Sequence, residues 1–272
     1  MKFALIDNNR IEAQPKLQGL CPFCFHPVIA KCGKQKVWHW AHRNTTACDS
    51  WGKAETEWRR TWKNNYPVEW QEISLLDEEI GEKHIADVRT AYNLVIEFQH
   101  SHIDPQERAS REKFYKNMVW IVDGTRLQRD YPRFIKGFKD FRTNQRGVYL
   151  VDFPDEVFPK SWLNSSVSVI FDFCGLSTTE QGEIKNILWC LLPQSDAMRA
   201  VVVGLKRDHF IERTHNRTQL FNTKKTRVPQ RPQRQITWPL RGYSQRRDPL
   251  IDDIEKRYFS RQYKPRGKGR RK

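Results

Sequence analysis

Apolar and polar side chains alternate most clearly between residues 84 and 101. The odd positions of residues 95–99 include Glu97 and Gln99, whereas positions 94, 96 and 98 are Leu, Ile and Phe. Because successive side chains of a strand point to opposite faces, this pattern predicts a strand with one apolar face against the core and a polar face that remains free. An apolar-flanked segment containing Asp87 comes first, and residues 89–93 are long enough to turn a hairpin. The pattern therefore predicts Asp87 beside Glu97 and Gln99.

The same reading outlines further elements on both sides of this hairpin. Helical spacing predicts helices over residues 54–64 and 105–116, the second with a proline in its first turn. Apolar, β-favouring runs predict strands at 68–75, 118–122, 147–153, 167–173 and 198–205. Residues 179–192 fit either a helix or a strand. The order indicates an α/β fold with a mixed sheet flanked by helices.

Composition divides the chain into four segments. Residues 1–50 are rich in Cys and His, 51–128 carry the alternating pattern, and 129–221 form an α/β extension of unassigned role. Residues 222–272 hold 17 Lys and Arg against 4 Asp and Glu, so they supply +13 of the formal charge of +16. Such a segment has too little apolar surface to fold, and we expect a disordered tail that binds nucleic acid. A purely solubilising tail is the alternative.

Neither a signal peptide nor a membrane span is evident in the sequence. No apolar run approaches the roughly 18 residues that a transmembrane helix needs. We therefore expect a cytoplasmic protein whose 6 cysteines are thiols or metal ligands rather than disulfides.

The first segment carries two closely spaced pairs of zinc-binding residue types. Cys21 and Cys24 are followed by His39 and His42, which together suit a tetrahedral Zn²⁺ site if the chain turns helically between the histidines. A set of three cysteines and one histidine that uses Cys48 is an alternative, and so is a reduced, metal-free cluster. Four protein ligands leave no position for a reactive water, so the expected zinc is structural.

The predicted acidic hairpin suits a different kind of metal. Carboxylates held close together bind Mg²⁺ or Mn²⁺, and such ions activate water and orient a scissile phosphate. Asp87 and Glu97 would be the principal ligands. Gln99 cannot accept a proton at neutral pH, so its amide would orient the water or contact a phosphate oxygen.

Several short motifs occur in an order that resembles one nuclease family. They are Cys21-x-x-Cys24, His39-Trp-Ala-His42, Glu55-Thr-Glu57-Trp58, Ala86-Asp87-Val88, Ile96-Glu97-Phe98-Gln99, Arg111-x-x-x-Tyr115 and Val119-Trp120-Ile121. In order and spacing they resemble the competence protein CoiA-like nucleases of the PD-(D/E)XK, or restriction-endonuclease-like, superfamily. The resemblance covers roughly residues 15–125. It implies a metal-dependent nuclease core behind a small zinc-ribbon-like module.

The resemblance also implies roles for individual residues. Asp87 and Glu97 match the metal-binding acids, and Gln99 holds the position of a lysine in much of the wider superfamily. Glu57 matches the acid of the first helix, with Glu55 as the alternative. Where relatives commonly have a histidine, this chain has Arg59.

Arg111 and Tyr115 are four apart, so they share a helix face. The resemblance implies that they contact substrate phosphate, and the alternative is that both pack over the sheet. The implied activity is that of a DNA endonuclease or nickase, in DNA uptake, recombination or defence against foreign DNA. The alternative is a catalytically inactive, nucleic-acid-binding accessory protein. A third reading makes the zinc module a docking element for protein partners in a larger complex.

Overall fold

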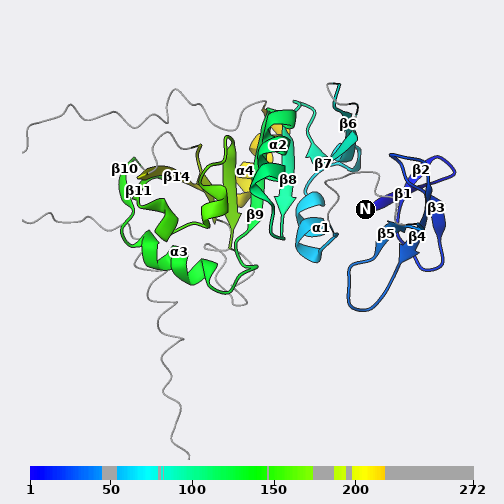
Figure 1. The fold of residues 1–272 in the computed structure, drawn as a ribbon, viewed down its shortest axis with the longest axis horizontal. Coiled ribbons are helices and arrows are strands. Elements are labelled where there is room, and N and C mark those ends of the chain that lie inside the picture. Colours follow the sequence, from blue (N-terminus) through cyan, green and yellow to red (C-terminus); the bar gives the residue numbers. More distant parts are fainter. Residues whose placement is uncertain are drawn as a thin grey trace, which may run out of the picture.

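Two β-sheets organise the part of the chain that the structure describes (Figure 1). The structure is a computed structural model and describes residues 1–44, 54–78, 81, 83–145, 147–173, 187–193 and 198–217. The basic tail and Cys48 lie outside these residues. None of the helices within the described ranges has the length and apolarity needed to span a bilayer.

The N-terminal module is a five-stranded antiparallel sheet in the order β2-β1-β3-β4-β5. Its strands are β1 (Phe3–Ile6), β2 (Asn9–Glu12), β3 (Gln18–Leu20), β4 (Pro27–Lys31) and β5 (His39–His42). A small core of its own contains Ala4, Cys21, Val28 and Trp40, all at most 1% exposed. Trp40 also donates its indole N–H to the Ile11 carbonyl at 2.9 Å. The module is therefore held by apolar packing as well as by its strand pairing.

The second sheet has nine strands in the order β10-β11-β14-β13-β12-β9-β8-β7-β6. They are β6 (Gln71–Leu76), β7 (Lys83–Arg89), β8 (Val95–Gln99), β9 (Met118–Asp123), β10 (Arg142–Gln145), β11 (Val148–Asp152), β12 (Ser168–Asp172), β13 (Ile187–Leu191) and β14 (Arg199–Lys206). Central β9 runs parallel to both β8 and β12, and the other neighbours are antiparallel. The strands of residues 129–217 thus continue the sheet that contains Asp87 and Glu97.

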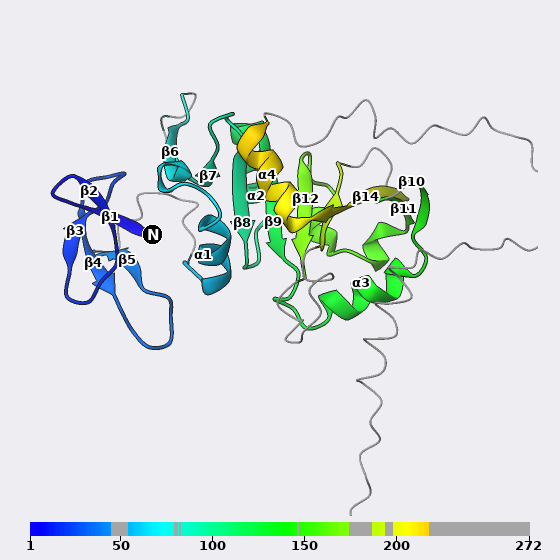
Figure 2. The same ribbon diagram turned by 180° about the vertical axis from the view of Figure 1, so that it is seen from behind.

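Helices cover both faces of this sheet (Figures 1 and 2). They are α1 (Glu57–Lys63), α2 (Pro105–Tyr115), α3 (Asp130–Phe138) and α4 (Arg207–Asn216), with short 3₁₀ turns at Val68–Trp70, Pro154–Glu156 and Lys160–Trp162. Trp62 of α1 and Phe210 of α4 belong to one core cluster, whereas Tyr115 of α2 and Phe134 of α3 belong to the other. The result is a three-layer α/β/α arrangement.

Local sequence explains where the two helices nearest the acidic hairpin begin. The Thr56 hydroxyl accepts the Arg59 N–H at 3.2 Å, which caps α1. Asp104 caps α2 by accepting the N–H groups of Gln106 and Glu107, and Pro105 occupies the first turn.

Most predicted elements are confirmed, with shifted ends. The helices expected at 54–64 and 105–116 are α1 and α2. The strand expected at 68–75 begins only at Gln71, because residues 68–70 form a 3₁₀ turn. Within residues 179–192, the described part is extended and forms β13.

Candidate functional sites

Asp87 and Glu97 face each other where β7 and β8 separate. The two strands pair only at Val88↔Ile96 and Arg89↔Val95. One residue further along, side-chain hydrogen bonds take the place of the main-chain bonds between the two strands. Asp87 Oδ2 accepts the Phe98 N–H at 2.9 Å, and the Asp87 N–H donates to Glu97 Oε1 at 3.3 Å. Each acid therefore bonds to the opposite strand, and the two carboxylates are held close together.

A third acid extends this pair into a row across three strands. The register of β6 on β7 pairs Gln71 with Val88 and Ile73 with Ala86, so Glu72, at a positive-φ position between the two pairs, lies level with Asp87. Glu72, Asp87 and Glu97 are 6%, 5% and 1% exposed. Three buried carboxylates in a row require compensating positive charge.

Each acid of the row is paired with a buried cation. Arg59 Nη2 bonds Asp87 Oδ1, and Arg111 Nη1 lies 3.0 Å from Glu97 Oε2. Lys63 Nζ lies 3.0 Å from Glu72 Oε1. Arg59 and Lys63 come from α1, which packs into the core cluster that contains Trp62. Arg111 comes from α2, which packs into the cluster that contains Tyr115, on the other face of the sheet. The two guanidinium groups thus reach the acid pair from helices of different layers.

The charges around this row shift the pKa values of Glu72 and Arg59. Burial alone raises the pKa of Glu72, but Lys63, the terminal ammonium group and the Lys2 N–H together lower it to about 2. Burial lowers the pKa of Arg59, but Asp87, Glu55 and Glu97 outweigh burial and raise it. Arg59 and Glu72 are therefore both ionised at neutral pH.

The first-helix acid differs from the one that the motif order favours. Glu57 is exposed at the start of α1. Glu55 is 8% exposed, and its Oε2 lies 2.6 Å from Lys63 Nζ. The structure thus brings Glu55, the alternative, rather than Glu57 into the buried charge network.

The polar face of β8 is not free, contrary to the prediction. Glu97 and Gln99 are each 1% exposed, and Arg111 of α2, itself buried, bonds to Glu97 from above the sheet. Gln99 donates its amide N–H to the Ser101 carbonyl at 2.8 Å. Arg111 contacts Glu97 and also Glu107, at 2.5 Å. Of the two predicted substrate-binding side chains, Arg111 therefore faces Glu97, and Tyr115 is buried in the core cluster on the α2 side of the sheet.

The acid pair meets one requirement of a Mg²⁺ or Mn²⁺ site and lacks another. Two adjacent carboxylates supply the hard oxygen donors that these ions prefer, so the donor chemistry fits. Their negative charge, however, is balanced by Arg59 and Arg111. A divalent ion at this pair therefore competes with bound guanidinium groups.

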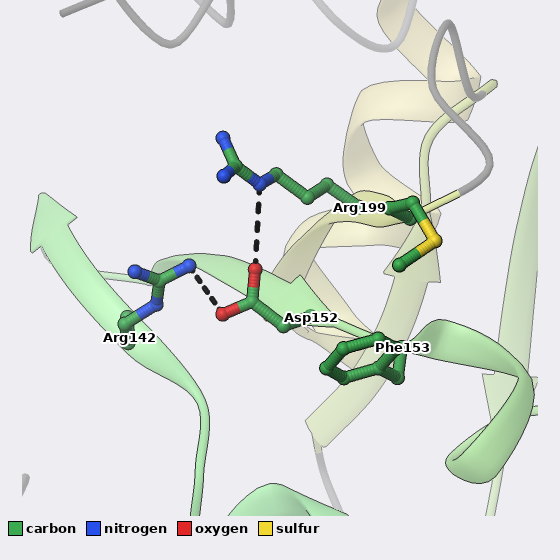
Figure 3. A pocket seen from close by; sticks show the side chains of 5 residues that line it. Arg142, Asp152, Phe153 and Arg199 are labelled. Atoms are coloured by element: carbon green, nitrogen blue, oxygen red, sulfur yellow. Dashed lines mark ion pairs between the residues drawn. The ribbon is translucent and has the colours of Figure 1, made fainter.

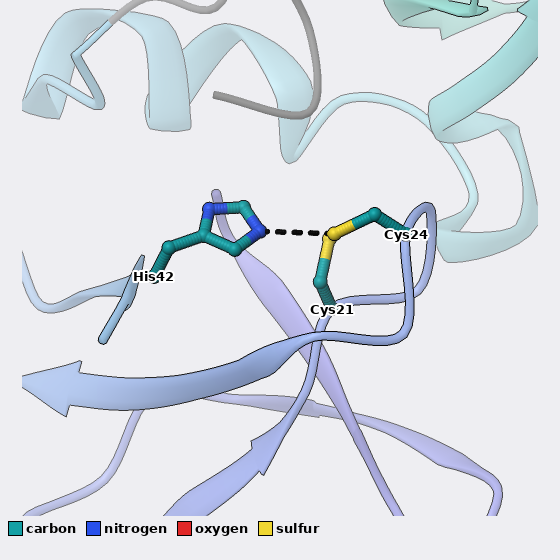
Figure 4. A group of neighbouring side chains, drawn as sticks. All are labelled: Cys21, Cys24 and His42. Atoms are coloured by element: carbon teal, nitrogen blue, oxygen red, sulfur yellow. Dashed lines mark hydrogen bonds between the residues drawn. The ribbon is translucent and has the colours of Figure 1, made fainter. Parts of the chain in front are cut away.

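A second group of metal-ligand residues lies in the N-terminal module (Figure 4). Ligand atoms of Cys21, Cys24 and His42 all lie within 4.8 Å of one another. Cys24 Sγ and His42 Nε2 are 3.2 Å apart. Two thiols and an imidazole at this spacing can bind a metal such as zinc.

His39 does not join this group, which corrects the predicted ligand set. The prediction required a helical turn, but residues 39–42 form strand β5. Positions three apart on a strand point to opposite faces, so His39 and His42 diverge. The His39 ring nitrogen Nδ1 instead lies 2.8 Å from the Val37 carbonyl oxygen. The alternative ligand Cys48 lies outside the described residues.

A surface pocket of about 290 Å³ lies near the far end of the nine-stranded sheet (Figure 3). It is lined by Arg142, Asp152, Phe153, Met198 and Arg199. Asp152 forms ion pairs with both arginines. None of the predicted site residues lines this pocket.

One comparison with known proteins bears on the first of these segments. Residues 6–50 match the family model of the competence protein CoiA, N-terminal domain. This CoiA match contains Cys21, Cys24 and His42 and ends before the acid row. Comparison of the chain with curated proteins and with solved structures gave no significant match.

Sequence reasoning missed Lys63 and Glu72, and it assigned Arg59 no partner. One signal was present: Arg59 and Lys63 are four apart on one side of α1, and Glu55 lies four residues before Arg59, just ahead of the helix. The partners of that side lie on other elements, so the signal alone does not identify them.

Proposed function

We propose that the protein is a metal-dependent nuclease that hydrolyses DNA phosphodiester bonds as an endonuclease or nickase. The observation that carries the proposal is the convergence of Asp87 and Glu97 at the point where β7 and β8 separate, with Gln99 on the same strand as Glu97. Together with the CoiA match at residues 6–50, this arrangement supports a role in DNA uptake, recombination or defence.

Asp87 and Glu97 would hold Mg²⁺ or Mn²⁺, which would supply activation of water and stabilisation of charge on the transferring phosphoryl group. Gln99 would orient the water or a phosphate oxygen through its amide. Arg111 would contribute positive charge beside Glu97, and Arg111 and Tyr115 would contact substrate phosphate. In the first segment, Cys21, Cys24 and His42 would hold a structural zinc ion.

A second candidate function is a catalytically inactive accessory protein that binds nucleic acid. The observation that favours it is the neutralisation of both acids by buried arginines. Under both functions the basic residues 222–272 would bind the polyanionic DNA backbone. DNA binding therefore does not discriminate between the two candidates.

A cleavage assay does discriminate between them. Supercoiled plasmid and single-stranded DNA are incubated with the wild-type protein and either Mg²⁺ or Mn²⁺. Glu97→Gln should abolish cleavage, whereas Glu69→Gln makes the same chemical change at an exposed position and should cleave like the wild type. Circular dichroism verifies that both variants are folded. The proposed nuclease function would be refuted if wild type and Glu97→Gln cleaved DNA equally, or if neither cleaved it.

A further inference from the structure

Arg59 lies against the acid that a divalent metal would have to bind. We propose that its guanidinium group is the resident counter-cation of Asp87, and that Mg²⁺ or Mn²⁺ binds the acid pair only after Arg59 has left it. This inference rests on the proposed nuclease function, but it concerns metal binding and is tested without cleavage.

Both oxygens of Asp87 are engaged by protein donors. Arg59 Nη2 bonds Oδ1, and the Phe98 N–H donates to Oδ2 at 2.9 Å. The Arg59 side chain is only 7% exposed, and its Nη1 donates to the Ala54 carbonyl at 2.9 Å. A metal ion that approaches Asp87 thus meets the positive charge of Arg59, which is already bonded to the Oδ1 atom of the carboxylate.

Electrostatics make the two cations mutually exclusive. A guanidinium group and a divalent ion on one carboxylate repel each other at contact distance, where little water screens them. A guanidinium group stays protonated throughout the pH range of folded proteins, so Arg59 does not yield by losing its proton. The guanidinium group must therefore move for the metal to enter.

Arg59 is better suited to this exchange than Arg111. Arg111 forms ion pairs with two acids, Glu97 and Glu107, and leaves Glu97 Oε1 directed at the Asp87 N–H. Arg59 has a single carboxylate partner within 4.0 Å among the described residues. DNA phosphate oxygens form the same charge-assisted bonds with guanidinium, so bound substrate offers Arg59 a replacement partner.

The test measures Mn²⁺ affinity by isothermal titration calorimetry at pH 8, with zinc-loaded full-length protein. Arg59→Gln removes the charge and should bind Mn²⁺ at least about tenfold more tightly than the wild type, given the coupling of close charge pairs. Arg59→His, mostly neutral at this pH, should also bind more tightly. Adding Asp87→Asn to Arg59→Gln should abolish the gain.

Arg108→Gln is the matched control. Arg108 is also a buried arginine, and its Nη1 lies 2.7 Å from Glu112 Oε1 on α2, away from the acid pair. Its loss should destabilise the fold similarly without a change in Mn²⁺ affinity. A thermal scan adds a second readout, because Mn²⁺ should raise the melting temperature of Arg59→Gln more than that of the wild type.

The outcomes separate this inference from the proposed nuclease. Equal Mn²⁺ affinity in wild type, Arg59→Gln and Arg59→His would overturn the role of Arg59, even if the wild type cleaves DNA. Tighter binding by the Arg59 variants would uphold that role, even if no variant cleaves DNA. Arg59→Gln could fail to fold without metal, and in that case its refolding on addition of Mn²⁺ supports the inference. If it does not refold, and Arg59→His binds Mn²⁺ with the same affinity as the wild type, the inference is contradicted.

Discussion

Replacing Glu72 by Gln is expected to remove a pH-dependent part of the stability. The Glu72 carboxylate accepts the Lys2 N–H at 2.7 Å and the Phe3 N–H at 3.3 Å, and Lys63 Nζ lies 3.0 Å away. It therefore connects β1 of the N-terminal module to α1 and to β6. Gln keeps the shape of the side chain but removes the charge that these donors stabilise.

The magnitude follows from the pKa of Glu72, which is about 2 in the folded protein against an ordinary value of 4.5. Because the folded pKa is the lower one, the stabilisation is fully present above pH 4.5 and is lost as the pH falls through 2. At 1.36 kcal/mol per pKa unit, the charged carboxylate contributes about 3 kcal/mol at pH 7 and about 1 kcal/mol at pH 3.

Urea unfolding followed by tryptophan fluorescence measures this difference at pH 7, 5 and 3. The wild type should exceed Glu72→Gln by about 3 kcal/mol at pH 7, and the gap should narrow to about 1 kcal/mol at pH 3. Any metal lost in acid would be lost from both proteins, so the difference between their stabilities would remain. Glu69→Gln, at an exposed position, should stay within about 0.5 kcal/mol of the wild type throughout. A gap that is constant from pH 7 to pH 3 would refute the reasoning.

Three further outcomes follow from the described contacts. His42→Ala should lower the zinc content of purified protein, measured by mass spectrometry, whereas His39→Ala should leave it unchanged. Asp172→Asn should destabilise the fold by about 2–3 kcal/mol in urea, because its buried carboxylate accepts two indole N–H groups and a bond from Arg207. Deletion of residues 222–272 should weaken DNA binding and flatten its salt dependence in fluorescence anisotropy.

Each of these expectations has a result that contradicts it. Equal zinc loss in the two histidine variants would remove the distinction between their positions on β5. Asp155→Asn, at an exposed acid, is the control for Asp172→Asn, and equal effects of the two would show that burial does not matter. Unchanged DNA affinity after the deletion would refute the proposed role of the tail.

Local patterns were sufficient for the acidic hairpin and its neighbouring helices. The alternation over residues 94–99 predicts β8 because half of its side chains face one apolar cluster, and Asp104-Pro105 marks the start of α2. The N-terminal strands are only three to five residues long, too short for a periodicity to emerge. Helix α3 was missed because Pro132 and Gly137 interrupt its pattern.

The acid pair of the candidate site was predictable from the sequence, but the charged residues around it were not. Asp87 and Glu97 lie ten residues apart, and a hairpin brings them together. Their cations come from α1 and α2, and which cation meets which acid depends on how these helices pack on the sheet. The divergence of His39 from His42 likewise depends on a choice between strand and turn that four residues do not determine.

The position of β9 has a consequence for how the chain folds during synthesis. Its two neighbours, β8 and β12, are both parallel to it, and β12 begins 45 residues after β9 ends. Until β12 has left the ribosome, one edge of β9 and the apolar Trp120 and Ile121 lack their final partners. Formation of this long-range pair is expected to be slow. A chain released after residue 128 would present a long unpaired edge, the kind of surface that chaperones hold and that aggregates form on.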